Sequence, residues 1–129
     1  MPVLLCVDDR PHFLLLRKAS LEQCGYSVVV AASIPAALAV LERMAVDAVL
    51  VEYKQEGMDA EAVTQHIKQR FPRQAVVLLS ACSEMPEAIL WLVDDYALRG
   101  EPLEQLAMRI DGVVRRKPTT PAWRRGRAA

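Results

Sequence analysis

The sequence is poor in the features that mark several large classes of protein. Its 129 residues include only three cysteines (Cys6, Cys24 and Cys82), and aromatic side chains make up 5% of the chain. An odd number of widely spaced cysteines fits neither a disulfide framework nor a paired-cysteine metal site, so we expect reduced thiols. No apolar run reaches the roughly 18 residues of a membrane span. No glycine-rich phosphate loop is present either, which argues against a nucleotide-dependent enzyme.

The amino terminus lacks the basic segment and the apolar core of a secretory signal peptide, because Asp8 and Asp9 follow a short apolar run. We therefore expect a cytoplasmic protein. Hydrophobic residues make up 53% of the chain and charged residues 25%, a mixture typical of a globular fold. The length suits one domain with a single core.

Acidic residues are missing from the last fifteen positions, which hold six basic side chains. Because the formal net charge is zero, the remainder of the chain carries a net charge of −6. Prolines and a glycine would interrupt any helix in this tail. We expect a domain over residues 1–116 and a flexible basic tail over 117–129. Nucleic-acid binding by the tail arginines, with Trp123 available to stack on a base, is an alternative with little support.

Short apolar runs alternate with segments whose apolar residues recur at helical spacing. The expected strands cover residues 3–7, 26–32, 49–52, 75–79 and 96–98. The expected helices cover residues 10–24, 33–44, 60–71, 86–92 and 102–116, with Met44 on the inner face of the second. Continuous apolar strands are typical of parallel sheets buried on both faces, and parallel neighbours need crossover helices. The sequence predicts the α/β class, with a doubly wound five-stranded parallel sheet.

Polar side chains stand where four of the expected strands end. Asp8 and Asp9 follow the first strand and Glu52 ends the third, while Ser80 and Arg99 follow the fourth and fifth. The carboxyl ends of parallel strands share one edge of the sheet, where functional crevices of such folds lie. We therefore expect these residues to gather at one rim. Taken alone, this stretch favours a solvated charge at a strand end as the interpretation of Glu52.

The order and spacing of these residues resemble the receiver domain of bacterial two-component response regulators. The resemblance covers residues 1–116 and implies a flavodoxin-like fold. An acidic pair after the first strand helps to bind Mg²⁺ in that family, and Asp8 and Asp9 look like that pair. With Glu52 they would offer three oxygen ligands for a weak Mg²⁺ site. Their mutual repulsion requires a cation or Arg99 to offset it.

The same resemblance implies roles around a phosphoryl group. Glu52 stands at the position of the phosphoacceptor aspartate. Ser80 stands at the hydroxyl that contacts the phosphoryl group, and Arg99 replaces the lysine that does the same. Tyr96 stands at the aromatic switch position, and Gly100 replaces the proline that usually follows the lysine.

Two of these departures favour a degenerate, or pseudo, receiver. Glutamate carries its carboxylate one methylene farther than aspartate, and the arginine fork can hold a carboxylate bidentately where lysine is a point charge. We expect Glu52 and Arg99 to be in contact and partly shielded, with Tyr96 turned inward toward Ser80. Such a pair would hold the domain in one state. Drift in a domain that kept only its fold is the alternative.

The sequence thus predicts a phosphorylation-independent, receiver-like module that acts by protein–protein binding and not by catalysis. The resemblance implies a partner face over the fourth helix, fifth strand and fifth helix, about residues 86–116. A histidine kinase or a downstream effector is the expected partner, and a homodimer and Mg²⁺ binding stay open. The alternatives are a functional phosphate-accepting response regulator and a nucleic-acid-binding adaptor.

Overall fold

The computed structural model describes residues 1–54, 57–81 and 85–116. The strands are β1 (Val3–Val7), β2 (Ser27–Ala31), β3 (Ala48–Tyr53), β4 (Val76–Ser80) and β5 (Asp95–Leu98). The helices are α1 (Pro11–Gln23), α2 (Ile34–Arg43), α3 (Ala60–Arg70), α4 (Glu87–Leu90) and α5 (Leu103–Arg116). The predicted tail, 117–129, lies outside the described residues.

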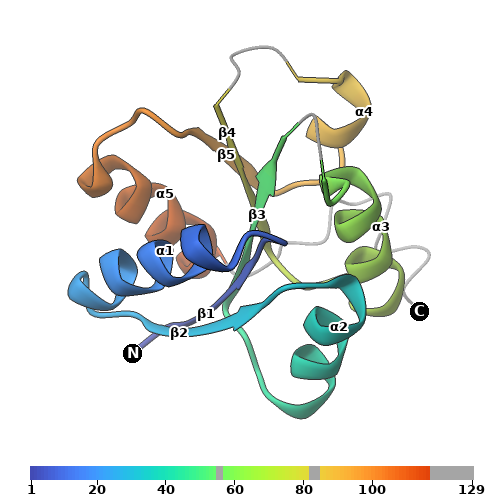
Figure 1. Ribbon diagram of the computed structural model, residues 1–129, viewed down its shortest axis with the longest axis horizontal. Coiled ribbons are helices and arrows are strands. Elements are labelled where there is room, and N and C mark those ends of the chain that lie inside the picture. Colours follow the sequence, from blue (N-terminus) through green and yellow to red (C-terminus); the bar gives the residue numbers. More distant parts are fainter. Residues whose placement is uncertain (55–56, 82–84, 117–129) are drawn as a thin grey trace.

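The five strands form one parallel sheet in the order β2-β1-β3-β4-β5 (Figure 1). This arrangement confirms the predicted class. The chain moves outward from β1 to β2 on one side and from β3 to β5 on the other, so the winding reverses between β1 and β3. Ligand sites of open α/β sheets lie at this switch point, which here is bordered by Asp8 and Glu52.

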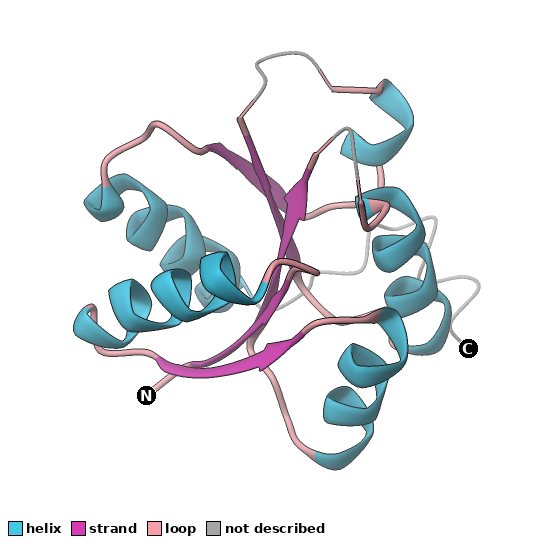
Figure 2. Ribbon diagram, viewed as in Figure 1, coloured by secondary structure: helices cyan, strands magenta, loops and turns pink. Residues whose placement is uncertain are grey.

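Helices cover both faces of the sheet (Figure 2). α1 and α5 pack on one face, where Leu4 and Ile110 belong to the same core cluster. α2, α3 and α4 pack on the other, where Leu5 and Ile67 belong to a second cluster. Neighbouring residues of β1 thus enter different cores, which explains why the strand is apolar at every position. Each fully buried leucine contributes about 1.5–3 kcal/mol to folding.

Side-chain caps and a local change of backbone set the helix limits. Ser33 accepts a hydrogen bond from the Ala36 amide at 3.2 Å and starts α2, as its sequence position predicts. At the other end, Met44 adopts extended backbone (φ −147°, ψ 152°), so α2 stops at Arg43. The side chain of Met44 is 40% exposed, and the predicted inner-face position is wrong. α4 is also shorter than its predicted range.

Within the described ranges, no helix combines the length and apolar character needed to cross a bilayer.

Candidate functional site

The carboxyl ends of the strands bring the predicted polar residues to one rim of the sheet. Asp8 follows β1 and is 5% exposed, Glu52 lies near the end of β3, and Ser80 ends β4 with no exposed surface. The amide of Arg99 donates to the carbonyl oxygen of Ser80 at 2.7 Å. The parallel register alone therefore places an acid, a hydroxyl and a guanidinium group at neighbouring strand ends.

Glu52 lies between two arginines. Its Oε1 is 2.9 Å from Nη2 of Arg99, and its Oε2 is 3.0 Å from Nη2 of Arg10. Its side chain is 8% exposed, so these contacts are largely shielded from water. The predicted contact with Arg99 is confirmed. Arg10 is an additional partner that the sequence reasoning missed.

The acidic pair after β1 is likewise held by cations. Arg10 forms a fork on Asp8, with Nε 3.1 Å from Oδ1 and Nη2 2.9 Å from Oδ2. Lys54 bridges the pair, because its Nζ lies 2.7 Å from Asp8 Oδ1 and also donates to Asp9 Oδ1. The amide of Met58 donates to Asp9 Oδ2 at 2.8 Å. Every oxygen of the three carboxylates therefore has a donor.

Phe13 supports the arginines from α1. The guanidinium carbons of Arg10 and Arg99 lie 4.2 Å and 4.8 Å from the centre of its ring, within the range of cation–π attraction. The hollow bounded by Phe13, Asp8 and Glu52, among others, measures about 10 Å³. A buried water needs at least about 10–15 Å³. The inner side of the cluster therefore has room for one water molecule at most.

The surroundings of Glu52 and Asp8 shift the pKa values of these two carboxyls. Burial raises the pKa of Glu52, and its hydrogen bond with Asp8 raises it further, against the opposing charges of Arg99 and Arg10. Burial also acts to raise the pKa of Asp8. Hydrogen bonds with Arg10, Glu52 and Lys54 outweigh it, and the pKa of Asp8 falls well below its usual range. The pKa values of the two carboxyls are thus shifted in opposite directions.

The expected Mg²⁺ ligands do not fit a metal ion as they are arranged. In the described part of the chain, no group of three or more His, Cys, Asp or Glu side chains is placed to hold one. Asp8 and Asp9 face the ammonium group of Lys54, and Glu52 faces guanidinium groups. Cations of the chain itself stand where the resemblance suggests an ion.

Tyr96 does not have the predicted orientation. Its side chain is 43% exposed, whereas the next residue, Ala97, is 1% exposed and points into the core. Because side chains alternate along a strand and Ala97 belongs to the core cluster beneath α1 and α5, Tyr96 points to the opposite face of β5. The inward orientation toward Ser80 is therefore wrong, and the switch role of Tyr96 stays a prediction.

The residues that sequence reasoning missed, Arg10 and Lys54, carry a weak signal in the sequence. Each stands two positions after an acid of the rim, Arg10 after Asp8 and Lys54 after Glu52. Residues two apart in extended chain project to the same side. This spacing could have suggested cations at the rim, although the Lys54 ammonium group contacts Asp8 and Asp9 and not Glu52.

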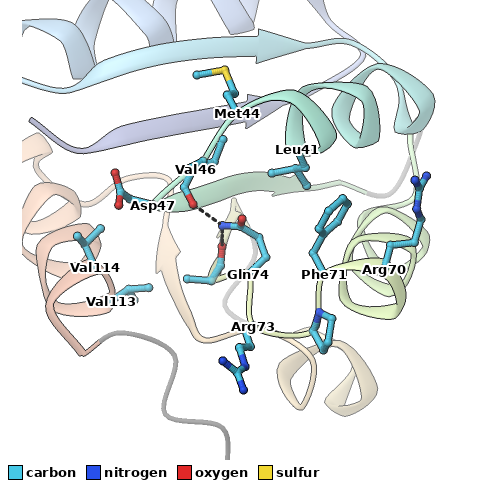
Figure 3. A pocket seen from close by; sticks show the side chains of 13 residues that line it. Leu41, Met44, Val46, Asp47, Arg70, Phe71, Arg73, Gln74, Val113 and Val114 are labelled. Atoms are coloured by element: carbon cyan, nitrogen blue, oxygen red, sulfur yellow. Dashed lines mark hydrogen bonds between the residues drawn. The ribbon is translucent and has the colours of Figure 1, made fainter. Parts of the chain in front are cut away.

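A separate groove of about 720 Å³ lies at the opposite, amino-terminal end of the sheet (Figure 3). Its lining comes from the ends of α2, α3 and α5 and from the segments before β3 and β4. Gln74 crosses it, and its Nε2 donates to the carbonyl oxygens of Val46 and Ala75 at 3.1 and 3.2 Å. None of the predicted site residues lines this groove, so it is distinct from the charged rim.

Comparison with known proteins identifies one family. The model of the response regulator receiver domain matches residues 4–97. The transcriptional regulatory protein GlrR of Escherichia coli K12 is 37% identical over 86 residues, which cover 67% of this chain and 19% of GlrR. The heme response regulator HssR of Staphylococcus aureus is 29% identical over 114 residues, covering 87% of this chain and 51% of HssR. The chain thus spans about a fifth of GlrR and half of HssR.

Solved structures share the fold. The response regulator TrrA of Thermotoga maritima, in complex with Mg²⁺ and BeF, has a TM-score of 0.77 at 24% identity, covering 88% of this chain and 99% of TrrA. A receiver domain from Clostridium thermocellum has a TM-score of 0.79 at 24% identity, and the match covers 91% of this chain and 97% of that domain. TrrA in complex with the histidine kinase ThkA has a TM-score of 0.77 at 24% identity, and the match covers 88% of this chain and 98% of that TrrA chain. At these identities the likeness concerns the fold.

Proposed function

Because this chain belongs to the response regulator receiver domain family, we propose that it is a two-component signalling module that acts by binding a partner protein without being phosphorylated. The observation that carries this proposal is the contact of Glu52 with Arg99 at 2.9 Å, with the Glu52 side chain 8% exposed. The residues at these two positions already form a shielded ion pair. The module works in the cytoplasm and by binding, not by catalysis.

The energetics of the pair support a domain held in one state. Keeping a two-state domain at 99:1 requires a bias of roughly 2.7 kcal/mol. An exposed ion pair supplies only about 0–1 kcal/mol. Glu52 is shielded and forms ion pairs with both Arg99 and Arg10, and salt screens a partly buried pair much less than an exposed one. The arrangement is therefore suited to supply more of the bias than an exposed pair.

The partner surface we propose is the face made by α4, β5 and α5, residues 86–116. Large apolar side chains are exposed there: Trp91 at 75%, Met108 at 73%, Tyr96 at 43% and Leu98 at 38%. Exposed aromatic side chains and methionines are enriched at protein interfaces. A histidine kinase or a downstream effector is the partner we propose, and a second copy of the chain is the competing occupant.

The proposal is tested by incubating the protein with acetyl phosphate and Mg²⁺ and measuring its intact mass. We expect no gain of a phosphoryl group. A stoichiometric gain that maps to Glu52 contradicts the proposal, and Glu52→Asp is the variant in which we look for a gain.

Partner binding is tested in parallel by pull-down with and without the phosphodonor. Trp91→Ala should lose the partner, whereas the control Leu15→Ala, which truncates a 63% exposed side chain on α1, should keep it. Capture should be the same with and without acetyl phosphate. Binding that requires the donor contradicts phosphorylation independence. Sedimentation of the protein alone reports self-association through this face.

A further inference from the structure

The charged rim balances its own charge. Asp8, Asp9 and Glu52 supply three negative charges, and Arg10, Lys54 and Arg99 supply three positive ones. Arg99 stands where the family has a lysine. The other two cations, Arg10 and Lys54, together carry the charge of one divalent metal ion.

We propose that the Lys54 ammonium group, assisted by Arg10, takes the place of the divalent metal ion and makes this receiver independent of metal. Lys54 bridges Asp8 and Asp9 as a shared metal ion would. The inference rests on the proposed function and deepens it, since cations already bound to Asp8 and Asp9 cannot coordinate an incoming phosphoryl group as a metal ion would.

The donors around the carboxylates oppose metal binding. Mg²⁺ requires near-ideal octahedral oxygen coordination at about 2.0–2.1 Å and gives up its water reluctantly. Both oxygens of Asp8 already accept bonds from Arg10, and one also accepts from Lys54. Asp9 is held by Lys54 and by the amide of Met58. An entering ion would have to displace several charged donors at once.

Low solvent exposure strengthens the attraction between the Lys54 ammonium group and Asp8. The side chains of Lys54 and Asp8 are 13% and 5% exposed, so bulk salt screens their attraction less than it screens a surface pair. Lys54 is also attached to the chain, so its binding to the acids is intramolecular and has the advantage of a high effective concentration. A millimolar ion in solution lacks that advantage.

The backbone at Gly57, after β3, suits the contact of Lys54 with the acidic pair. Gly57 has a φ of +90°, and a Cβ atom there would lie 2.7 Å from Asp9 Oδ2 and 3.1 Å from Lys54 Cε. Glycine suits this position because a residue with a Cβ is strained at a positive φ and would press on the side chains of Asp9 and Lys54. The backbone, and not only the lysine side chain, is adapted to this contact.

The test is a titration of the full chain with MgCl₂ by isothermal calorimetry, and with MnCl₂ by loss of the electron paramagnetic resonance signal of the free ion. The wild-type protein should show no saturable binding in the millimolar range. Lys54→Met should gain one saturable site, with an affinity at least about tenfold above any wild-type signal. Lys54→Arg, which keeps the charge, should behave as the wild type.

Saturable binding to Asp8 and Asp9 in the wild type overturns the proposal. So does a folded Lys54→Met variant that gains no site. If Lys54→Met fails to fold, Lys54→Gln, which keeps a polar group, is titrated in its place, and the absence of a gained site in that variant overturns the proposal in the same way. Neither phosphodonor nor partner is used, so failure here is distinguishable from failure of the proposed function.

Discussion

At the amino-terminal end of the sheet, Lys68 lies 2.8 Å from Asp94, whereas at the carboxyl end three carboxylates are shared among three cations. Asp94 also accepts a hydrogen bond from the Val76 amide at 2.7 Å, and Lys68 donates to the carbonyl of Gln74 at 2.6 Å. The amino-end contacts connect α3, the start of β4 and the residue before β5. They fasten backbone segments together.

The carboxyl-end cluster differs because its charges have alternative partners. Asp8 is bound by two cations, and Glu52 is also bound by two. Removal of one cation leaves another in place. We therefore expect the buried Lys68–Asp94 contact, which joins backbone segments, to contribute more to stability than any single contact of the shared cluster at the rim.

The largest effect is expected from breaking the amino-end contact. Asp94→Ala removes the carboxylate beside Lys68, whose side chain is 7% exposed, together with the acceptor for the Val76 amide. We expect a loss of about 3 kcal/mol in the free energy of unfolding, measured by urea denaturation. Asp94→Asn keeps an acceptor and should lose less. A loss below about 1 kcal/mol for Asp94→Ala would contradict this view of the amino end.

Two glycines with positive φ provide a matched comparison between the ends. Gly25 (φ +94°) lies in open space after α1, whereas Gly57 (φ +90°) crowds Asp9 and Lys54. Gly25→Ala should cost about 1 kcal/mol from backbone strain alone, and Gly57→Ala about 2 kcal/mol or more because of the added overlap. Thermal melting of both variants measures the difference. Equal costs would show that the loop does not need the close approach.

Single losses from the cluster should be smaller. Arg99→Ala leaves Arg10 on Glu52, so we expect about 1 kcal/mol of destabilisation, and less for Arg99→Lys. Removing Arg10 and Arg99 together should cost more than the sum of the single changes, because Glu52 then loses both guanidinium groups. Additive losses in this double-mutant cycle would argue against a shared cluster.

The smallest expected effect is the pH dependence of stability, to which Glu52 and Asp8 contribute with opposite signs. The raised pKa of Glu52 means that wild-type stability falls, relative to Glu52→Gln, as pH rises from the ordinary value of 4.5 through the raised pKa. The lowered pKa of Asp8 means that its stabilising charge is fully present above the ordinary value of 3.8 and is lost as pH falls. Urea denaturation between about pH 2 and 7 measures both. If the stability of wild type relative to Glu52→Gln and relative to Asp8→Asn changed in the same direction with pH, the assignment would be contradicted.

Periodicity and strand ends predicted most of the fold and the composition of the rim. The apolar runs located all five strands, and their ends placed Asp8, Glu52, Ser80 and Arg99 at one edge without any knowledge of side-chain conformation. This succeeded because parallel register fixes where strand ends lie. The Glu52–Arg99 contact followed from that register and from opposite charge.

Side-chain direction beyond the strand ends could not be predicted in the same way. Lys54 follows β3 and Arg10 precedes α1, in connections where no periodicity sets orientation, so their turn toward the acids was missed. Tyr96 was placed inward by analogy, but the register of β5 turns Ala97 inward instead. Met44 was counted as helical although the chain becomes extended there.

The cluster at the rim also has a consequence for the time course of folding. Lys54 and Asp8 are 46 positions apart in the chain, and Arg99 joins them only once the last strand has paired with β4. Contacts between such distant segments tend to form late, after much of the chain entropy has been lost. We expect Arg99→Ala to accelerate unfolding in stopped-flow experiments and to leave the folding rate nearly unchanged. We thus expect the arginine after the last strand to lengthen the lifetime of the folded domain without speeding its formation.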